Sequence, residues 1–472
     1  MRKTLPALST LSLALLLGTP AFGLDLNEAY EKARQNDPNW LVARNTYLAD
    51  SREDAVGLGG LLPTVAANGS VSQNTFDADT GGSVDFDATQ WAIKATQPLF
   101  RPDAWFNYQR SRASASAAEA TYRSQEQALA LRVSQAYFGV LSAQETLAYA
   151  QAEEAAFGRQ LDQAQQRFDV GLIAITDVLE ARASFDSSRA NRIAAEAALQ
   201  AAQENLAVVI GEAPGGLVPL KPDAPMVKPV PADPESWVAL ARERNPDLLV
   251  ARQNEQVARA ASRQAKSGYL PTVDLYGSYS SLDRSVTPAT APAALSMNSQ
   301  NGTTTSVGLE ASWVLFAGGR TYNASKQASY RAAAAQDAAI GTEKQVVNTT
   351  RTAFNNVSAD AYRVEARKQA VASSEASLDA TQAGYEVGTR NIVDVLLAQR
   401  NMYAAKRDYA AARYDYVLNS LRLKAASGQL TEVDIRELNA WLDPHASVIS
   451  APDKPLEEPA AAPAPAPASK KR

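Results

Sequence analysis

The sequence predicts a mainly α-helical protein with a membrane β-barrel part, built from two duplicated halves. Three observations predict this fold class: an internal repeat, two long spans without proline, and four segments with the periodicity of amphipathic strands. The repeat is clearest in Arg167–Leu179 and Gly384–Leu396, which share an aromatic and an acidic residue, Val-Gly, and a final Asp-Val-Leu. Each unit is far longer than a solenoid repeat, so we expect two αββα-type half-proteins.

The two copies keep a nearly constant offset along the chain. Leu62-Pro63-Thr64-Val65 recurs 208 positions later as Leu270-Pro271-Thr272-Val273. The offset has grown to 216 at Leu315, and it is 217 between Val170 and Val387. The extra residues therefore belong to a longer loop in the second copy, before Leu315.

The chain ends differ in composition from the repeats. Arg2 and Lys3 precede a short apolar run at Leu11–Leu17 and then small residues, which is typical of a secretory signal peptide. The last residues are rich in proline and alanine, which favours an extended and disordered tail. We predict a signal peptide (1–23), repeat 1 (24–218), a proline-rich linker (219–235), repeat 2 (236–443) and a disordered tail (444–472).

Two spans contain no proline, residues 103–213 and 293–443, and both are rich in the helix formers Ala, Gln, Glu and Arg. In each span we predict a long helix of roughly 100 Å at 1.5 Å per residue. Each long helix ends at a Val-Gly pair, where glycine suits a left-handed C-cap. A return helix should then pack against it as an antiparallel coiled coil. The predicted long helices are about 104–168 and 320–383, and the return helices about 177–210 and 391–427.

Two strand pairs precede the long helices, at about 64–97 and 272–315. In the first pair, Trp91, Ile93 and Ala95 fall on one face and Lys94 on the other. Segments of about ten residues with one apolar face and one polar, charged face fit tilted transmembrane β-strands. A pair of ordinary soluble hairpins is the alternative at this point.

Four strands cannot close a barrel, because the smallest closed barrels need about eight. An open sheet edge is not tolerated in lipid. If the strands cross a membrane, the chain must therefore oligomerise. Two copies would supply eight strands and three would supply twelve, and the count alone does not choose between them.

The composition excludes several functional classes. The chain has no cysteine and one histidine, His445, which removes disulfides and most zinc-site and catalytic-triad candidates. We therefore expect neither an enzyme nor a cofactor or metal site. The net charge is −5, and about −7 without Arg2 and Lys3, which argues against a nucleic-acid partner.

Together these segments resemble the TolC family of outer-membrane efflux and secretion channels, in its unlipidated branch. The resemblance rests on Asp37-Pro38 and Asn245-Pro246, on the Leu-Pro motif before each strand pair, and on the two segments around Val170 and Val387. It implies a homotrimer with a shared twelve-stranded barrel and a long helical tunnel through the periplasm. It also implies three partners: a periplasmic adaptor (membrane fusion) protein, an inner-membrane pump of the RND, ABC or MFS type, and outer-membrane lipid.

The resemblance also assigns roles to residues near the helix ends. Arg390 matches the arginine that latches the closed entrance, Thr176 and Asp177 match its partners on the next protomer, and Tyr385 joins the same network. Asp394 matches one acidic residue of a constriction ring. Six residues match the tips that contact the adaptor: Val170, Gly171, Leu172, Val387, Gly388 and Thr389.

The residues around these sites also have a simpler interpretation. Asp177 with Glu180, and Asn391 with Asp394, have the spacing of helix-capping pairs, which could explain both aspartates. The family has a second ring aspartate where this chain has Leu397, which predicts a weaker acidic ring. Glu180 could compensate if it faces the lumen, but a capping role is the interpretation we favour.

We therefore predict an outer-membrane channel that extends into the periplasm. It would conduct drugs, small molecules or secreted proteins for a tripartite efflux pump or a type I secretion system. The alternative is a trimeric coiled-coil surface adhesin or envelope scaffold. That alternative predicts one continuous heptad stalk and one membrane anchor rather than duplicated strand pairs.

Overall fold

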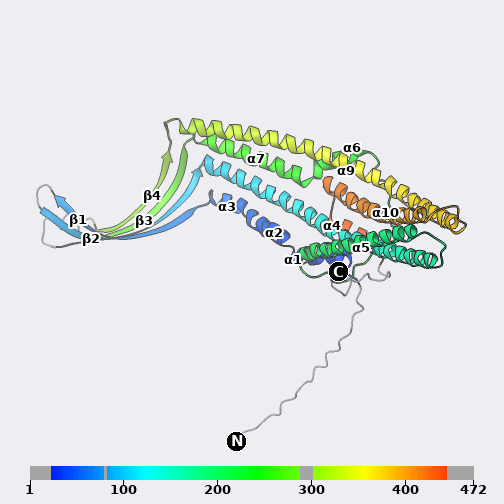
Figure 1. Cartoon of the computed structure of the whole chain (residues 1–472). Coiled ribbons are helices and arrows are strands. Elements are labelled where there is room, and N and C mark those ends of the chain that lie inside the picture. Colours follow the sequence, from blue (N-terminus) through cyan, green and yellow to red (C-terminus); the bar gives the residue numbers. More distant parts are fainter. Residues whose placement is uncertain (1–22, 79–81, 288–300, 444–472) are drawn as a thin grey trace, which may run out of the picture.

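The computed structural model describes residues 23–78, 82–287 and 301–443. The predicted signal peptide (up to residue 22) and the predicted disordered tail lie outside this range. Figure 1 shows a four-stranded sheet at one end of an elongated molecule and two long helical hairpins that run to the opposite end. No described helix combines the length and the apolar character needed to cross a membrane.

The helices follow the duplication. Each half places short helices before its strand pair, then a very long helix and a shorter return helix. The long helices α4 and α9 begin and end within three residues of the predicted positions. In chain order the helices are α1 (Leu26–Asn36), α2 (Pro38–Asp50), α3 (Glu53–Gly59), α4 (Pro102–Asp169), α5 (Ile175–Ile210), α6 (Pro234–Arg244), α7 (Pro246–Ser267), α9 (Arg320–Glu386), α10 (Ile392–Ala426) and α11 (Glu432–Asn439).

Proline and asparagine set the junctions between the short helices. Asp37 caps α2 and Asn245 caps α7, each by accepting a backbone N–H, and each is followed by proline in the first turn. The Asn36 side chain donates to the carbonyl of Ile210 at the end of α5, and the Asn245 side chain donates to the carbonyl of Ala426 at the end of α10. The return helix of each half therefore ends against the junction between two short helices, α1–α2 in the first half and α6–α7 in the second.

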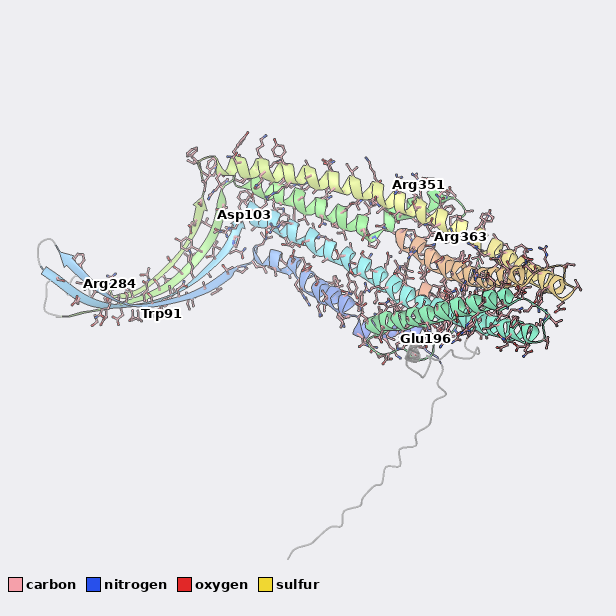
Figure 2. The ribbon with its side chains drawn as sticks, in the orientation of Figure 1. Trp91, Asp103, Glu196, Arg284, Arg351 and Arg363 are labelled. Atoms are coloured by element: carbon pink, nitrogen blue, oxygen red, sulfur yellow. The ribbon has the colours of Figure 1, made fainter. Side chains whose placement is uncertain are left out.

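The strands β1 (Thr64–Ala78), β2 (Gly82–Phe100), β3 (Thr272–Thr287) and β4 (Gly302–Ser312) form one antiparallel sheet in the order β1-β2-β3-β4. The central pair β2–β3 joins the two halves of the chain. Figure 2 shows Trp91 and Arg284 on this sheet, at the end of the molecule away from the tips of the two helical hairpins.

The pairing register places the predicted apolar residues on a shared face. Ile93 lies opposite Ala67 on β1 and Tyr279 on β3, and Leu275 lies opposite Leu309 on β4. Lys94 and its partner Ser278 lie on the other face because side chains alternate along a strand. The two-faced sheet and the doubled-back helices confirm the predicted fold class.

The main core lies at mid-length, where α1, α4, α5, α10 and α11 meet. Tyr137 on α4 is fully buried there, and its hydroxyl donates to the carbonyls of Leu24 and Val218 on either side. The proline-rich linker is held against α10, since Val227 exchanges two hydrogen bonds with the Tyr416 hydroxyl. The hairpins extend from this core to their tips.

Candidate functional site at the hairpin tips

The two hairpin tips lie at the end of the molecule opposite the sheet (Figure 1). At the first tip, the Gly171 N–H donates to the carbonyl of Phe168 and the Leu172 N–H donates to that of Arg167, both at 2.8 Å. Gly171 has φ +77°, so this pair of bonds is the left-handed Schellman ending of a helix. The predicted glycine cap is confirmed.

The second tip repeats the same geometry. The Gly388 N–H donates to the carbonyl of Tyr385, the Thr389 N–H donates to that of Gly384, and Gly388 has φ +78°. Three apolar side chains at the two tips are exposed to about three-quarters of their area: Val170, Leu172 and Val387. Each chain therefore presents two equivalent apolar tips at the free end of its hairpins.

Helix α10 begins with a complete capping box, as its sequence predicts. The Asn391 side chain accepts the N–H of Asp394 at 2.8 Å, and the Asp394 carboxylate accepts the N–H of Asn391 at 3.4 Å. Arg390 stands just before this cap, and its guanidinium is 3.9 Å from Asp394. Asp394 is therefore both a helix cap and the acidic neighbour of Arg390 within one chain.

Helix α5 begins differently, and the capping pair predicted at Asp177 and Glu180 is wrong. The helix starts at Ile175 with Ala174 as its N-cap, and no side chain caps it. Thr176 and Asp177 therefore lie in its first turn, where Thr176 is exposed and Asp177 partly exposed. An acidic side chain is favourable in a first turn because of the helix dipole. Since Asp177 does not cap the helix, its carboxylate is available for other contacts.

Tyr385 is part of the contact between the two hairpins. It packs on a small apolar cluster made by Phe157 of α4 with Ile392 and Leu396 of α10. The Arg167 guanidinium lies over the Tyr385 ring, 5.0 Å from its centroid. No sequence pattern points to Arg167, because the contact joins residues more than two hundred positions apart.

The residues predicted to form a latch do not all meet within one chain. Arg390 forms no ion pair or hydrogen bond with Thr176 or Asp177 in the described part of this chain. Leu397 is 53% exposed, one turn beyond Asp394 on α10, and Glu180 is exposed on α5. No group of three or more potential metal-binding side chains occurs among the described residues.

A partly buried ion pair joins the hairpins nearer the core. Glu153 of α4 is almost fully buried and accepts a hydrogen bond at 3.0 Å from Arg407 of α10. One turn along α10, the Tyr403 hydroxyl donates to the carbonyl of Ala152. Burial raises the pKa of Glu153 above the usual glutamate range, although Arg407 and Arg400 act in the opposite direction.

Known proteins share this architecture. A family model described as outer membrane efflux protein matches residues 29–212 and 237–429. The chain is 36% identical over 442 residues to the outer membrane protein TolC of Escherichia coli K12, across 93% of this chain and 89% of that protein. It is 31% identical over 431 residues to the alkaline protease secretion protein AprF of Pseudomonas aeruginosa, across 89% and 88% of the two chains.

Solved structures with lower identity share the fold. The CmeC outer membrane channel of Campylobacter jejuni gives a TM-score of 0.72 at 16% identity, covering 94% of this chain and 98% of that one. The open state of the MtrE outer membrane channel of Neisseria gonorrhoeae gives a TM-score of 0.70 at 18% identity, covering 86% and 90%.

Proposed function

This chain belongs to the outer membrane efflux protein family, and we propose that three copies of it form one continuous duct through the outer membrane and the periplasm. The family consists of outer-membrane channels for efflux and type I secretion and not of enzymes. The duct supplies a path, and the energy and selectivity come from a partner pump.

The observation that carries this proposal is the two-faced sheet with unpaired edges. Within the described chain, β1 and β4 each pair on one side only. Unpaired backbone groups are not tolerated in lipid, so another copy must supply the missing partner strands. Three copies would place β4 of one chain beside β1 of the next and close a twelve-stranded barrel.

The opposite end of the molecule supports a docking role. The two exposed apolar tips of each chain would form a ring of six in the trimer. Val170, Gly171 and Leu172 in the first tip, and Val387, Gly388 and Thr389 in the second, would receive a periplasmic adaptor protein. The adaptor would connect the duct to an inner-membrane pump of the RND, ABC or MFS type.

The resting entrance would be closed by contacts between neighbouring chains. We assign Arg390 to this latch, with Thr176 and Asp177 of the next protomer as its partners and Tyr385 as a supporting residue. The partly exposed first turn of α5 leaves Asp177 free for such a contact. Asp394 would supply one acidic position of the ring at the narrowest point.

Drugs, other small molecules and secreted proteins are the proposed cargo. The relatives include a protein named for alkaline protease secretion, which supports secreted proteins among them. The adhesin or scaffold alternative requires one continuous stalk. The two doubled-back hairpins and the second strand pair are not compatible with it.

The proposal is tested by comparing a deletion strain of the source bacterium with its parent strain. Loss of the channel should increase susceptibility to several unrelated drugs, reduce at least one secreted protein in the medium, or do both. Complementation with the wild-type chain should restore the phenotype. Unchanged drug susceptibility and an unchanged secretome would contradict the proposal.

A further inference from the structure

A basic groove lies on the outside of the helical wall, next to the sheet. It has a volume of about 340 Å³ and runs between α4 and α7. Three arginines line it: Arg112 from α4, and Arg259 and Arg263 from α7. All three side chains are exposed. In Figure 1, α7 runs beside α4 with its last turn at the base of the strands.

The groove carries excess positive charge. Arg259 pairs with Glu255 on its own helix, and that carboxylate does not line the groove. In the described part of the chain, neither Arg112 nor Arg263 has a carboxylate within ion-pairing distance. Exposed Lys266 continues the row of basic side chains on α7 toward the sheet, and we call this row the basic stripe. Two arginines without a carboxylate partner therefore face each other across one groove.

The stripe belongs to the outer side of the tunnel wall. Arg252, Arg259 and Arg263 share one face of α7, because their spacings of seven and four residues return to the same side of a helix. On that face, Arg252 donates to the carbonyl of Arg242 at the end of α6. Helix α6 forms an additional layer over α7 and α9, and a closed tunnel has room for such a layer only on its outside.

Large aromatic side chains mark where this face meets the membrane. Trp105 lies two turns before Arg112 on the same face of α4 and is half exposed. Trp313 continues the outward apolar face of β4, and its indole N–H donates to the carbonyl of Tyr269 just after α7. Trp and Tyr gather at membrane interfaces, where one end of the ring is wet. These aromatic residues therefore set the level at which the hydrocarbon ends.

The distance from the aromatic residues to Arg112 along α4 suits contact between Arg112 and a lipid headgroup. Seven residues of α4 separate Trp105 from Arg112, which is about 10 Å along the helix axis. The headgroup layer on each side of a bilayer is about 5–7 Å thick, and arginine side chains extend toward it from below. Basic grooves between helices at this depth hold anionic headgroups.

We propose that Arg112, Arg259 and Arg263 bind the phosphate of an anionic phospholipid in the leaflet that faces the helices. Each trimer would hold three such lipids around the base of its barrel. The guanidinium forks suit phosphate because each can donate two parallel hydrogen bonds. The proposal rests on the outer-membrane location of the chain and on neither the latch nor the adaptor contact.

The test is lipid retention by the purified channel in native mass spectrometry. Detergent-extracted protein is mixed with phosphatidylglycerol or with phosphatidylcholine at equal concentration. We expect up to three phosphatidylglycerol molecules per assembly, and retention at least about tenfold weaker in the triple variant Arg112→Gln, Arg259→Gln, Arg263→Gln. A triple Arg→Lys variant, which keeps the charge but loses the paired donors, should bind more lipid than the Gln variant and less than the wild type.

A matched variant and a competitor make the test decisive. Arg159→Gln, Arg182→Gln, Arg189→Gln removes the same charge from exposed positions near the hairpin tips and should retain the lipid as the wild type does. Equal retention by the groove variant, or equal retention of phosphatidylcholine by the wild type, would overturn the proposal. Displacement of the lipid by millimolar inorganic phosphate would also overturn it, because the groove would then be a simple phosphate site.

Discussion

Arg390 illustrates how one residue can be predicted while its neighbours cannot. A cation just before a helix start is unfavourable beside the dipole, so the sequence alone indicates that Arg390 needs an acidic partner. The structure supplies one within the chain, Asp394, at 3.9 Å. That distance is long, and exposed pairs are each worth only about 0.2–1 kcal/mol. The pair therefore leaves Arg390 available to Asp177 of a neighbouring chain.

If Arg390 latches the entrance, removing it should open the channel. We expect Arg390→Ser, especially combined with Tyr385→Phe, to raise single-channel conductance in planar bilayers, because contacts that hold neighbouring hairpins are lost. Arg189→Ser, an exposed arginine further along α5, is the control and should leave conductance unchanged. Unchanged conductance in the double variant would place the latch at other residues.

The acidic ring should be weak in this chain. Leu397 occupies the position one turn beyond Asp394, about 4.5 Å along the axis, so one of two possible carboxylate layers is absent. We expect trivalent cations to block the channel weakly and Leu397→Asp to strengthen the block sharply. Asp394→Asn is the suitable probe of the remaining layer, because asparagine keeps a side-chain oxygen for the helix cap. Tight block that survives this substitution would show that other residues bind the cation.

Glu153 should give the hairpins a pH-dependent stability. Its raised pKa means that the folded chain binds this proton more tightly than the unfolded chain. The stability contributed by Glu153 is thus present below the usual glutamate pKa and is lost as the pH rises through the raised value. As the pH is lowered from about 7 to about 4, the Tm of the wild type should therefore rise relative to the Tm of Glu153→Gln. A difference that is constant with pH would contradict this prediction, and Glu119→Gln on the exposed face of α4 is the control.

The helix ends show what local chemistry determines and what it leaves open. The C-terminal ends of α4 and α9 were predictable, because Val-Gly pairs end long alanine-rich runs and the glycines adopt φ of +77° and +78°. The start of α10 was predictable from Asn391 and Asp394. The start of α5 was not, because Ala174 caps it without a side chain and the polar residues that attract a prediction follow it. In that case packing of the hairpin decides the boundary.

The tip glycines can be tested for a role beyond capping. Apart from the adjacent residues, no atom in the described part of the chain lies within 4 Å of a Cβ added at Gly171 or Gly388, so a side chain there meets open space. Its cost is the left-handed backbone, about 1–2 kcal/mol per residue. We expect the double variant Gly171→Leu, Gly388→Leu to assemble but to lose efflux, because the added side chains block the approach of the adaptor.

Asparagine at the same two positions separates strain from contact, since it tolerates the left-handed conformation better than leucine. If the double Asn variant also loses efflux while its assembly is intact, the exposed backbone of the tips is the docking surface. Normal efflux in the double Leu variant would leave the glycines with a capping role alone.

Over the whole molecule, the duplication made the fold predictable, whereas contacts between distant residues limited how much of the candidate site could be predicted. The repeat, the proline-free spans and the strand periodicity each follow from local sequence, so the class and order of the elements could be predicted. Arg167 on Tyr385, Glu153 with Arg407, and the groove between Arg112 and Arg263 each join positions at least 150 residues apart. Nothing in one sequence shows such neighbours until the helices are placed side by side.

The sheet edges lead to a prediction about assembly. The apolar face shared by Ile93, Tyr279 and Leu309 needs lipid, while the free edges of β1 and β4 cannot remain unpaired in it. We therefore expect the mature protein to be a heat-modifiable oligomer in the outer-membrane fraction. Native mass spectrometry of detergent-extracted protein should give three copies. Proline substitutions on β4, such as Val307→Pro, should weaken the oligomer because they remove a backbone donor, whereas Val393→Ala on α10 should not. A stable monomer that retains its strands would contradict the shared barrel.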